Sequence, residues 1–477
     1  MVKYKEMHNA CARMVLISRR ASATAARSRH FSVHTEEKAE REGEQGDLQL
    51  WTWGRSDVGQ LALGDETTRK CPNQVKAILL PYFQGLAPVQ GRLSPHPRVY
   101  SLPEASFSKA GAISSNRNSE TVKNSEEESR GGAGNVGIAC GLFHSALWQN
   151  GNLWMWGKGD GGRLGLDSEV SKYVPTLVGN TSAVRSVAMG GLHSVILTEN
   201  GAVYTCGYGG FGALGHGVYQ RELQPRLVED LESEKLVHIA AGGAHSAAVS
   251  ESGDVYTWGR DEGEGRLGHG NEDLMNEGVL AVPLKVQELP EPIVVVACGG
   301  FFTMALTLDG QLWSWGGNSN YELGRGDKRN DFRPKQVPNM YNNRIVQVAC
   351  GGYHSTALTE DGQVLTWGHG GHGQLGHGCL SNGKVPQVVE ALIDQQIVYV
   401  ACGSLWTAAV TESGALYTWG KNRDYQLGIP GLLDVQTVPA RVTFQPSSNQ
   451  QLQAQPQVIA VCGGASHGMC LVHRRYK

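Results

Sequence analysis

The chain has 477 residues, of which 63 are glycine and 18% are charged, and its formal net charge is −3 at pH 7. Glycine at this frequency without a three-residue period fits a turn-rich repeat protein and excludes a collagen-like one. No apolar run approaches the roughly 18 residues of a membrane-spanning helix, so no membrane span is expected.

Residues 1–35 differ in composition from the rest of the chain. They hold one acid, Glu6, against seven cations: Lys3, Lys5, Arg13, Arg19, Arg20, Arg27 and Arg29. An N-terminus rich in Arg and Ser and poor in acids is typical of an organelle transit peptide. The sequence therefore predicts a disordered mitochondrial transit peptide over residues 1–35, with cleavage near Phe31 and a start at either Met1 or Met14. A chloroplast peptide, or the basic arm of a nuclear or cytosolic protein, is the alternative.

The charge of the remaining body limits its partners. Removing residues 1–35 removes a charge of +6 and takes the net charge from −3 to −9. An acidic body argues against the binding of duplex DNA through general electrostatics. The sequence also shows no run of interleaved basic and aromatic residues suited to single strands, so direct binding of RNA is not established.

A short motif ending in Trp-Gly recurs along the chain after residue 48. Its copies are Trp53-Gly54, Trp156-Gly157, Trp258-Gly259, Trp315-Gly316, Trp367-Gly368 and Trp419-Gly420, with Cys206-Gly207 as a copy that lacks the Trp. From the second copy on, the spacings are 50, 52, 57, 52 and 52 residues. A period near fifty residues indicates a repeat architecture.

The first unit contains an insertion. The interval from Trp53 to Cys140 is 87 residues, whereas the matching interval from Trp367 to Cys402 is 35. The extra residues, 84–134, are rich in Pro, Ser, Asn, Glu and Gly and show no period. They are expected to form a disordered surface loop, either a tolerated insertion or a flexible arm that binds a partner.

Each unit contains a predicted β-hairpin between two fixed landmarks. One landmark is a small-residue corner, such as Gly351-Gly352, and the other is a Leu-Gly pair after the Trp-Gly motif. The Leu-Gly pairs are Leu63-Gly64, Leu164-Gly165, Leu214-Gly215, Leu267-Gly268, Leu323-Gly324, Leu375-Gly376 and Leu427-Gly428. Between the landmarks, two β-prone runs meet at a turn such as Asp361-Gly362, where Gly accepts a positive φ. The aromatic face of the second strand, with Tyr256 and Trp258, is expected to pack on the next copy.

The two ends of the repeat region complement each other. The region starts at Leu48 with the second half of a hairpin and ends near Val472 with the first half. Pairing these halves closes a ring and removes two exposed sheet edges. The sequence thus predicts an all-β protein, a seven-bladed β-propeller over residues 48–473 with one blade closed between N- and C-terminal strands.

The repeat unit, V-A-C-G-G-x-H-S-x-A-L-T-x-D-G-x-V-x-T-W-G-x(4)-G-x-L-G, resembles that of the regulator of chromosome condensation family of seven-bladed propellers. Together with the predicted transit peptide, the chain looks like the plant mitochondrial branch of that family. This resemblance implies a role in organelle transcript splicing and, through it, in the biogenesis of respiratory complex I. The founding nuclear member implies an alternative, a guanine-nucleotide exchange factor for a small GTPase. That activity uses a β-wedge that protrudes from one blade and specific rim acids, and the third and fourth units, of nearly standard length, offer no candidate wedge.

Cysteine and histidine occupy fixed positions of the repeat. Five cysteines share one position, which Met189 and Ala241 fill in the other two copies: Cys140, Cys298, Cys350, Cys402 and Cys462. Because Met and Ala are accepted there, buried core thiols are expected rather than metal or redox chemistry. Four residues later stand His144, His193, His245 and His354. They are predicted to be hydrogen-bonded structural residues, and no catalytic set, cofactor site or metal site is expected; the His-rich loop after Trp367 is a weaker metal candidate.

One set of positions points to partner binding. The residue after Trp-Gly is basic in five of seven copies: Arg55, Lys158, Arg260, His369 and Lys421. Acids lie close by, at Asp57, Asp160, Asp261, Glu262 and Asp424. Equivalent positions in a ring lie on one rim, so these residues are expected to share a face, either as a solvated rim or as a partner-binding surface.

The sequence therefore predicts a non-enzymatic interaction scaffold, because function on such rings resides in the loops. Its expected partners are proteins, including a mitochondrial ribonucleoprotein or splicing complex, with a small GTPase as the alternative. The expected location is the mitochondrial matrix, with the nucleus or cytosol as the alternative. Photoreception of the ultraviolet-B kind is disfavoured, because that relative repeats Gly-Trp-Arg-His-Thr where this chain has Gly-Gly-x-His-Ser.

Overall fold

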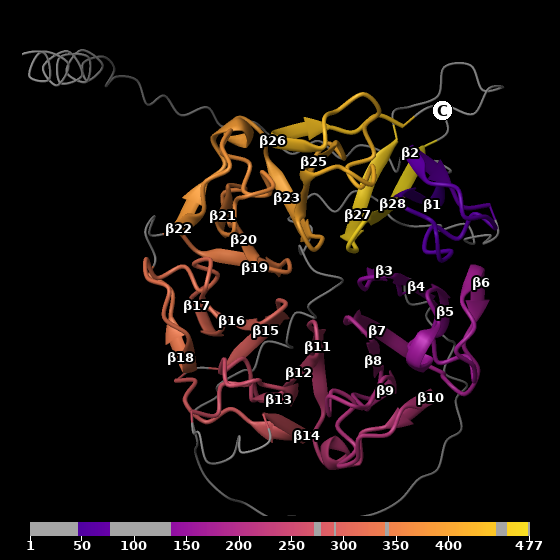
Figure 1. Ribbon diagram of the computed structural model, residues 1–477, viewed down its shortest axis with the longest axis vertical. Coiled ribbons are helices and arrows are strands. Elements are labelled where there is room, and N and C mark those ends of the chain that lie inside the picture. Colours follow the sequence, from indigo (N-terminus) through magenta and orange to yellow (C-terminus); the bar gives the residue numbers. More distant parts are fainter. Residues whose placement is uncertain are drawn as a thin grey trace, which may run out of the picture. The chain divides into compact units, whose positions relative to one another are not determined.

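Seven four-stranded antiparallel sheets make up the repeat region (Figure 1). The computed structural model describes residues 46–76, 135–270, 278–290, 292–338, 343–444 and 456–475. Within these ranges lie 28 strands and three one-turn 3-10 helices, η1 (Asp160–Gly162), η2 (Glu229–Leu231) and η4 (Glu390–Leu392). The predicted all-β, seven-bladed propeller is confirmed. The predictions for residues 1–35 and 84–134 lie outside the described residues.

The blades are numbered along the ring, and their strands are given from the centre outwards. Blade 1 contains β27 (Gln457–Gly463), β28 (His467–Arg475), β1 (Gly46–Gly54) and β2 (Arg69–Gln74). Blade 2 contains β3 (Val136–Cys140), β4 (His144–Gln149), β5 (Asn152–Gly157) and β6 (Lys172–Leu177). Blade 3 contains β7 (Val184–Met189), β8 (His193–Thr198), β9 (Val203–Gly207) and β10 (Glu222–Leu227). Blade 4 contains β11 (Leu236–Ala241), β12 (His245–Ser250), β13 (Val255–Arg260) and β14 (Val279–Lys285).

The remaining three blades follow the same order. Blade 5 contains β15 (Ile293–Cys298), β16 (Phe302–Thr307), β17 (Leu312–Gly316) and β18 (Asp331–Gln336). Blade 6 contains β19 (Ile345–Cys350), β20 (His354–Thr359), β21 (Val364–Gly368) and β22 (Gly383–Val388). Blade 7 contains β23 (Ile397–Cys402), β24 (Trp406–Thr411), β25 (Leu416–Lys421) and β26 (Val435–Arg441). The innermost strands contact their counterparts on both sides, so the ring is continuous around its centre (Figure 1).

Blade 1 is assembled from the two ends of the repeat region. β1 pairs with β28 over nine residues, from Gly46 opposite Arg475 to Gly54 opposite His467. β27 completes the blade on the inside and β2 on the outside. The predicted closure by N- and C-terminal strands is therefore confirmed, and it leaves β1 and β28 without a free edge.

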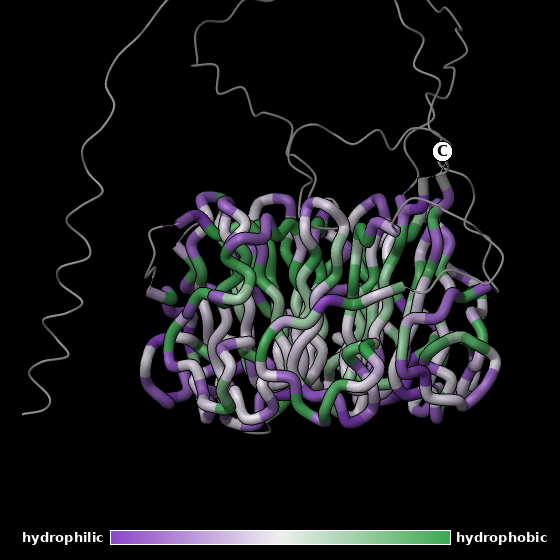
Figure 2. Tube along the Cα trace, turned by 90° about the horizontal axis from the view of Figure 1, so that it is seen from above, coloured by the Kyte–Doolittle hydropathy of each residue, from purple (hydrophilic) through white to green (hydrophobic). Residues whose placement is uncertain are grey.

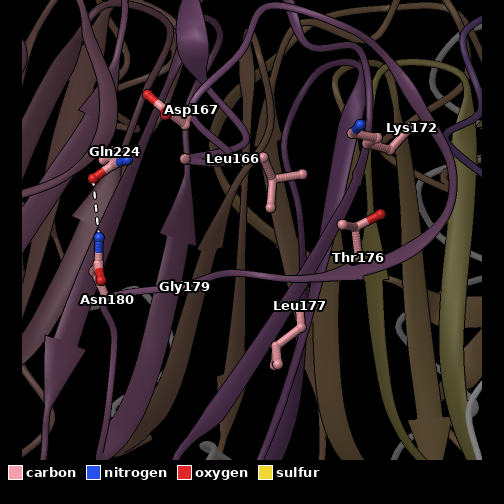
Figure 3. Close-up of a pocket in the computed structure, with 9 residues that line it drawn as sticks. Leu166, Asp167, Lys172, Thr176, Leu177, Gly179, Asn180 and Gln224 are labelled. Atoms are coloured by element: carbon pink, nitrogen blue, oxygen red, sulfur yellow. Dashed lines mark hydrogen bonds between the residues drawn. The ribbon is translucent and has the colours of Figure 1, made fainter.

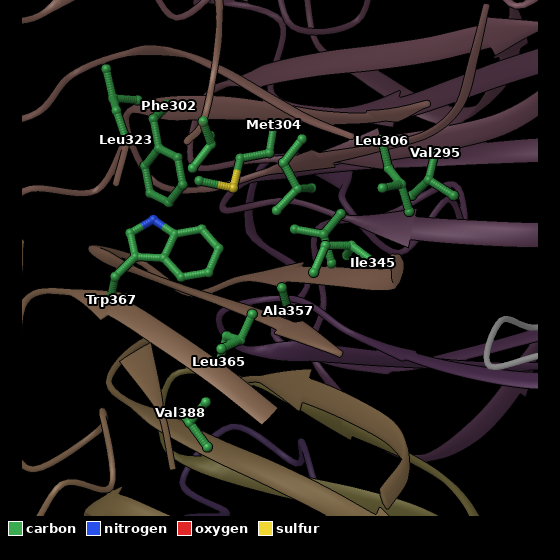
Figure 4. Packing of buried hydrophobic residues seen from close by; sticks show 13 residues of the cluster. Val295, Phe302, Met304, Leu306, Leu323, Ile345, Ala357, Leu365, Trp367 and Val388 are labelled. Carbon is green, nitrogen blue, oxygen red and sulfur yellow. The ribbon is translucent and has the colours of Figure 1, made fainter. Parts of the chain in front are cut away.

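The core lies in the seams between blades, where apolar side chains of two sheets meet. At the seam between blades 5 and 6, Trp367 packs against Phe302 and Met304 within a cluster of 13 buried residues (Figure 4). Trp367 belongs to blade 6, so it packs on the preceding blade. Trp258 likewise shares a buried cluster with Val195 and Leu197 of the preceding blade 3. The expectation that the aromatic face packs on the next copy was wrong in direction, because the indole N–H finds its acceptor in the preceding blade.

That acceptor is the carbonyl of the residue before the conserved Leu. The Trp367 and Ser355 side chains of blade 6 both donate to the Glu322 carbonyl of blade 5, at 2.8 and 3.1 Å. The same pair of bonds occurs at other seams, with these acceptors: Gln60 for Trp156 and Ser145, Ala213 for Trp258 and Ser246, Arg266 for Trp315 and Thr303, and Gln374 for Trp419 and Thr407. Each of these five seams thus combines apolar burial with two satisfied buried donors.

In blade 1 the structural counterpart of the Leu-Gly pair is Leu61-Ala62. Thr52 donates to the Leu61 carbonyl at 2.8 Å, as Thr366 does to that of Leu375. Ala62 has a φ of 61°, in the left-handed region that glycine occupies in the other blades. The prediction that Leu63-Gly64 holds this position was wrong by two residues, because alanine stands in this blade where the other blades have the glycine of the Leu-Gly pair.

Hydropathy follows the architecture (Figure 2). Hydrophobic residues concentrate along the strands, and hydrophilic loops crowd the two rims of the ring. In the part of the chain that the structure describes, no helix has the length and apolar character needed to cross a membrane.

Candidate partner-binding rim

The five predicted rim residues occupy equivalent positions at one end of the ring, here called the Trp-Gly rim. The backbone N–H of each donates to the carbonyl of the residue before the repeat's His position. The bonds join Arg55 to Ser466, Lys158 to Phe143, Arg260 to Ala244, His369 to Tyr353 and Lys421 to Leu405, at 2.8 to 3.0 Å. Tyr208 and Gly317 make the same bond in blades 3 and 5. The opposite end, here called the hairpin rim, carries the turns between the second and third strands of each blade, such as Asn150-Gly151.

The cations of the Trp-Gly rim are paired with acids. Lys158 lies 2.9 Å from the Asp160 carboxylate, Arg55 lies 2.5 Å from that of Asp57, and Arg260 pairs with Glu262. In blade 7, Lys421 lies 3.9 Å from Asp424, which is also 3.9 Å from Arg55 of blade 1. The hydrogen bond from Lys158 lowers the pKa of Asp160. These exposed pairs contribute little to stability and leave a rim of alternating charge.

His369 differs from the other four. Its Nδ1 atom is hydrogen-bonded to the Gln374 amide at 2.9 Å, and its ring lies against Tyr353 and His372. Burial and the neighbouring His372 lower the pKa of His369 below its usual value. The imidazole is therefore neutral at pH 7, and its inclusion among the basic rim residues was wrong in charge though right in position.

Aromatic side chains lie between the rim cations, an arrangement that the sequence did not predict. The Arg260 guanidinium of blade 4 lies 4.6 Å from the ring centre of Phe211 in blade 3, and that ring also contacts Tyr208. At the next seam Arg266 covers Phe301, which stacks on Tyr353 at 5.6 Å. This aromatic arc, formed by Tyr208, Phe211, Phe301 and Tyr353, spans blades 3 to 6. Its members are interleaved with cations only across seams, so no window of sequence displays the pattern.

Asp261 is a structural residue of the rim loop. Its side chain is fully buried and accepts hydrogen bonds from the backbone N–H groups of Gly265 and Leu267, both at 3.0 Å. Its grouping with the exposed rim acids was therefore wrong. The adjacent Glu262 and Glu264 provide the accessible carboxylates at this blade, both 3.1 Å from the Arg266 guanidinium.

The repeat histidines are structural, as predicted. His193 and His354 are buried, and the Nε2 atom of each meets a hydroxyl of the following blade, Ser246 and Thr407, at 2.9 Å. Burial lowers the pKa of His193 to about 4 and that of His354 to about 3. Phe302 and Trp406 occupy the position in blades 5 and 7. These imidazoles are thus neutral seam residues, enclosed and away from the rim surface.

A hollow of about 250 Å³ lies at the outer edge of the ring between blades 2 and 3 (Figure 3). It is lined by residues of the loops before and after β6, of β6 itself and of β10. Asp167 and Lys172 lie on different sides of it, and an amide hydrogen bond of 3.0 Å joins Asn180 to Gln224 (Figure 3). Among the described residues, no three His, Cys, Asp or Glu side chains gather in a group that could hold a metal ion.

Comparison with known protein families shows which family the repeats match. The profile of the RCC1-like domain matches residues 217–474, and that of the regulator of chromosome condensation (RCC1) repeat matches residues 150–197 and 184–213. The chain is 49% identical over 433 residues to the RCC1 domain-containing protein RUG3, mitochondrial, of Arabidopsis thaliana, which covers 90% of this chain and 89% of that protein.

Two further similarities concern other members of the same architecture. The chain is 33% identical over 343 residues to the ultraviolet-B receptor UVR8 of Arabidopsis thaliana, covering 71% of this chain and 74% of the receptor. The crystal structure of Prp20p from Saccharomyces cerevisiae superposes with a TM-score of 0.69 at 21% identity, over 93% of this chain and 96% of Prp20p. At that identity the superposition supports the shared fold alone.

Proposed function

We propose that this chain, which belongs to the family of regulator of chromosome condensation (RCC1) repeat propellers, is a non-enzymatic scaffold of the mitochondrial matrix. Its Trp-Gly rim binds protein partners in a ribonucleoprotein or splicing complex. Through transcript splicing it supports the biogenesis of respiratory complex I. The splicing and complex I roles come from the resemblance to the plant mitochondrial branch of the family, and the rim is the surface that we assign to them.

The mitochondrial location rests on two independent observations. The N-terminal 35 residues have the composition of a transit peptide, and the relative that shares 49% identity is itself described as mitochondrial. If the peptide is removed on import, mass spectrometry of the protein from tissue should find a mature N-terminus near residues 31–35. Recovery of the bulk of the protein with an intact N-terminus would argue against import.

One observation carries the binding role: the Trp-Gly rim combines paired charges with accessible aromatic rings. Tyr208 and Tyr353 are exposed, and Arg260 and Lys158 each lie over an aromatic ring of the same rim. Aromatic residues and arginine are the side chains that most often dominate the energetics of protein interfaces. Alternating charges add specificity and orientation to such a surface.

Charge reversal on this rim tests the proposal. Replacing Arg55, Lys158, Arg260 and Lys421 by Glu should leave the fold intact, since surface substitutions cost within about 0.5 kcal/mol each. The variant should lose its salt-dependent co-purification with partner proteins from isolated mitochondria. It should also fail to restore splicing of at least one mitochondrial intron in a line that lacks the protein.

The hairpin rim supplies a matched control. Lys235 and Lys285 are exposed cations paired with Glu251 and Asp254 at 2.7 and 2.9 Å, so they resemble the rim pairs in local chemistry. Lys235→Glu and Lys285→Glu should preserve partner capture and splicing. Equal losses in both variants, or normal splicing in a null line, would overturn the proposal.

Exchange-factor activity is the second candidate, and one observation favours it. The Trp-Gly rim exposes the carboxylates of Asp57 and Asp160, and Prp20p, which shares the fold, is described as binding Gsp1p. Purified propeller would then accelerate GDP release from a cognate small GTPase, and Asp160→Asn would reduce the rate more than Lys158→Gln. We expect no acceleration, and clear catalytic release of GDP would replace the scaffold proposal with this one.

A further inference from the structure

Two of the repeat cysteines lie in contact at the centre of the ring. Cys140 ends β3 of blade 2 and Cys462 lies in β27 of blade 1, and their Sγ atoms are 2.9 Å apart. Both residues keep part of their surface exposed to solvent. The equivalent Cys350 and Cys402 instead lie against backbone carbonyls of the preceding blade, Ala297 and Ala349, at 3.8 and 3.6 Å. The Cys140–Cys462 pair is therefore specific to one seam.

At that seam the chain that connects the two blades is the longest in the ring. Residues 75–135, a stretch of 61, separate β2 of blade 1 from β3 of blade 2. Residues 389–396, a stretch of eight, separate β22 of blade 6 from β23 of blade 7. A long connection confines neighbouring blades less effectively than a short one, because the entropy of closing the loop grows with its length. A covalent cross-link between neighbouring blades is therefore expected to stabilise the ring most at the seam between blades 1 and 2.

The surroundings give the two thiols different reactivity. Cys140 lies opposite Ser145 in the β3–β4 ladder, and Ser145 is hydrogen-bonded to the His467 Nε2 atom at 2.9 Å. Burial by itself would raise the pKa of Cys140, but the hydrogen bond with Cys462 and the nearby His467 bring it below its usual value. Burial raises the pKa of Cys462 well above its usual value. Cys140 is thus the nucleophile and Cys462 the thiol that resolves the oxidised intermediate.

We propose that Cys140 and Cys462 form a reversible disulfide site that closes the seam between blades 1 and 2, with hydrogen peroxide as the oxidant. The Cys140 thiolate attacks one peroxide oxygen, the O–O bond breaks, and the departing hydroxide takes up a proton to leave as water. The resulting sulfenic acid is attacked by the Cys462 sulfur, the S–O bond breaks, and the second oxygen leaves as water. Two electrons pass from the thiols to the peroxide, and a dithiol reverses the reaction by exchange.

The disulfide joins the C-terminal strand pair of blade 1 to blade 2. It links positions 322 residues apart in the sequence, and such long loops gain the most from a cross-link in the chain-entropy view. Blade 1 is the blade made from both ends of the repeat region, so the disulfide restrains the opening of the ring at its split blade. The oxidised ring should therefore open less readily than the reduced one.

Peptide mapping of the full-length protein tests the site directly. After treatment with hydrogen peroxide and digestion without reductant, the Cys140 and Cys462 peptides should appear joined, with the loss of two hydrogens. The thermal midpoint should rise by roughly 2–5 °C and return to its starting value with dithiothreitol. The rate of oxidation should fall as the pH is lowered, because the Cys140 thiolate becomes protonated.

Alanine variants provide matched controls, since Ala241 holds this position in blade 4. Cys140→Ala and Cys462→Ala, made separately, should each abolish the rise in thermal midpoint. Cys350→Ala, at the same position in blade 6, should retain it. The inference is overturned if folded, oxidised protein contains no Cys140–Cys462 peptide, or if Cys462→Ala still shows the rise. Peptide mapping of the unsubstituted protein decides the matter even if a variant fails to fold.

Discussion

Two seams of the ring share one geometry and differ in chemistry. Between blades 5 and 6, and between blades 1 and 2, a Trp of the later blade donates to a carbonyl of the earlier one, Trp367 to Glu322 and Trp156 to Gln60. At the first seam the remaining contacts are mainly apolar, centred on Phe302. At the second they include an imidazole–hydroxyl bond from His467 and a pair of thiols.

The two seams also differ in the length of the chain that connects their blades. Residues 337–344 join blade 5 to blade 6, whereas residues 75–135 join blade 1 to blade 2. From the logarithmic dependence of loop entropy on length, the longer connection costs roughly 2 kcal/mol more to close. The length of the connection does not decide whether a seam has a histidine bond, because blades 6 and 7 are joined by eight residues and still share the His354–Thr407 bond. The residue at the repeat's His position decides it, Phe302 at the seam of blades 5 and 6 and His467 at the seam of blades 1 and 2.

Loss of the split blade, blade 1, should have the largest effect on the stability of the ring. Deleting residues 458–477 removes β28 and almost all of β27, so β1 loses its inner partner and two sheet edges open. We expect an aggregated or severely destabilised protein by size-exclusion chromatography and thermal unfolding. Removal of only Tyr476 and Lys477, which follow the last strand, is the control. A deletion variant that melts like the full chain would contradict the split blade.

Truncation of Trp367, the aromatic residue at the seam of blades 5 and 6, should have the second-largest effect on stability. Trp367→Ala removes a fully buried indole from the apolar seam and should lower the free energy of unfolding by about 3–5 kcal/mol. Trp367→Phe keeps most of the buried area and should lose about 1–2 kcal/mol, since it leaves the Glu322 carbonyl with one donor fewer. Denaturant titration measures both. Equal losses would mean that the hydrogen bond, rather than packing, holds this seam.

Backbone conformation distinguishes the same two seams. Gly324 has a φ of 72° at the seam of blades 5 and 6, and an added Cβ would lie 2.7 Å from the Trp367 Nε1 atom. Gly324→Ala should therefore cost about 1–3 kcal/mol in unfolding free energy. Ala62 holds the equivalent position at the seam of blades 1 and 2, where the chain accommodates the methyl group. Ala62→Gly should change stability by less than about 1 kcal/mol, and a similar loss for both variants would refute the difference.

Acid sensitivity should separate seams with a histidine from the seam that has Phe302. In the native state burial lowers the pKa of His354 to about 3, whereas an exposed imidazole in the unfolded chain titrates near 6.5. Above pH 6.5 both states are neutral and stability is unaffected. As the pH falls below 6.5 only the unfolded state gains the proton, so stability is lost down to about pH 3. By pH 5 the loss is roughly 1–2 kcal/mol for each such residue.

His354→Phe imitates blade 5 and should flatten this pH dependence. The measurement is the thermal midpoint between pH 7.5 and pH 5, in the variant and in the unsubstituted protein. Lys384→Gln, an exposed substitution in the same blade, should leave the slope unchanged. An unaltered slope in His354→Phe would show that the acid sensitivity lies elsewhere.

The sequence by itself determined the number of blades, the closure between N- and C-terminal strands and the shared rim positions of Arg55, Lys158, Arg260, His369 and Lys421. These follow from the order and period of the repeats, because residues at one repeat position occupy one place in every blade. It also anticipated the structural role of His193 and His354, since Phe and Trp replace them in other copies.

Only the tertiary structure decided which side chains of neighbouring blades meet across a seam. Arg260 lies over Phe211 and Cys140 meets Cys462 because neighbouring blades bring together residues that no local pattern relates. The burial of Asp261 and the positive φ of Ala62 depend on how one loop folds against its neighbour. A repeat specifies where each residue stands within its own blade. The charge, exposure and reactivity of that residue depend on the side chains that the adjacent blade places against it.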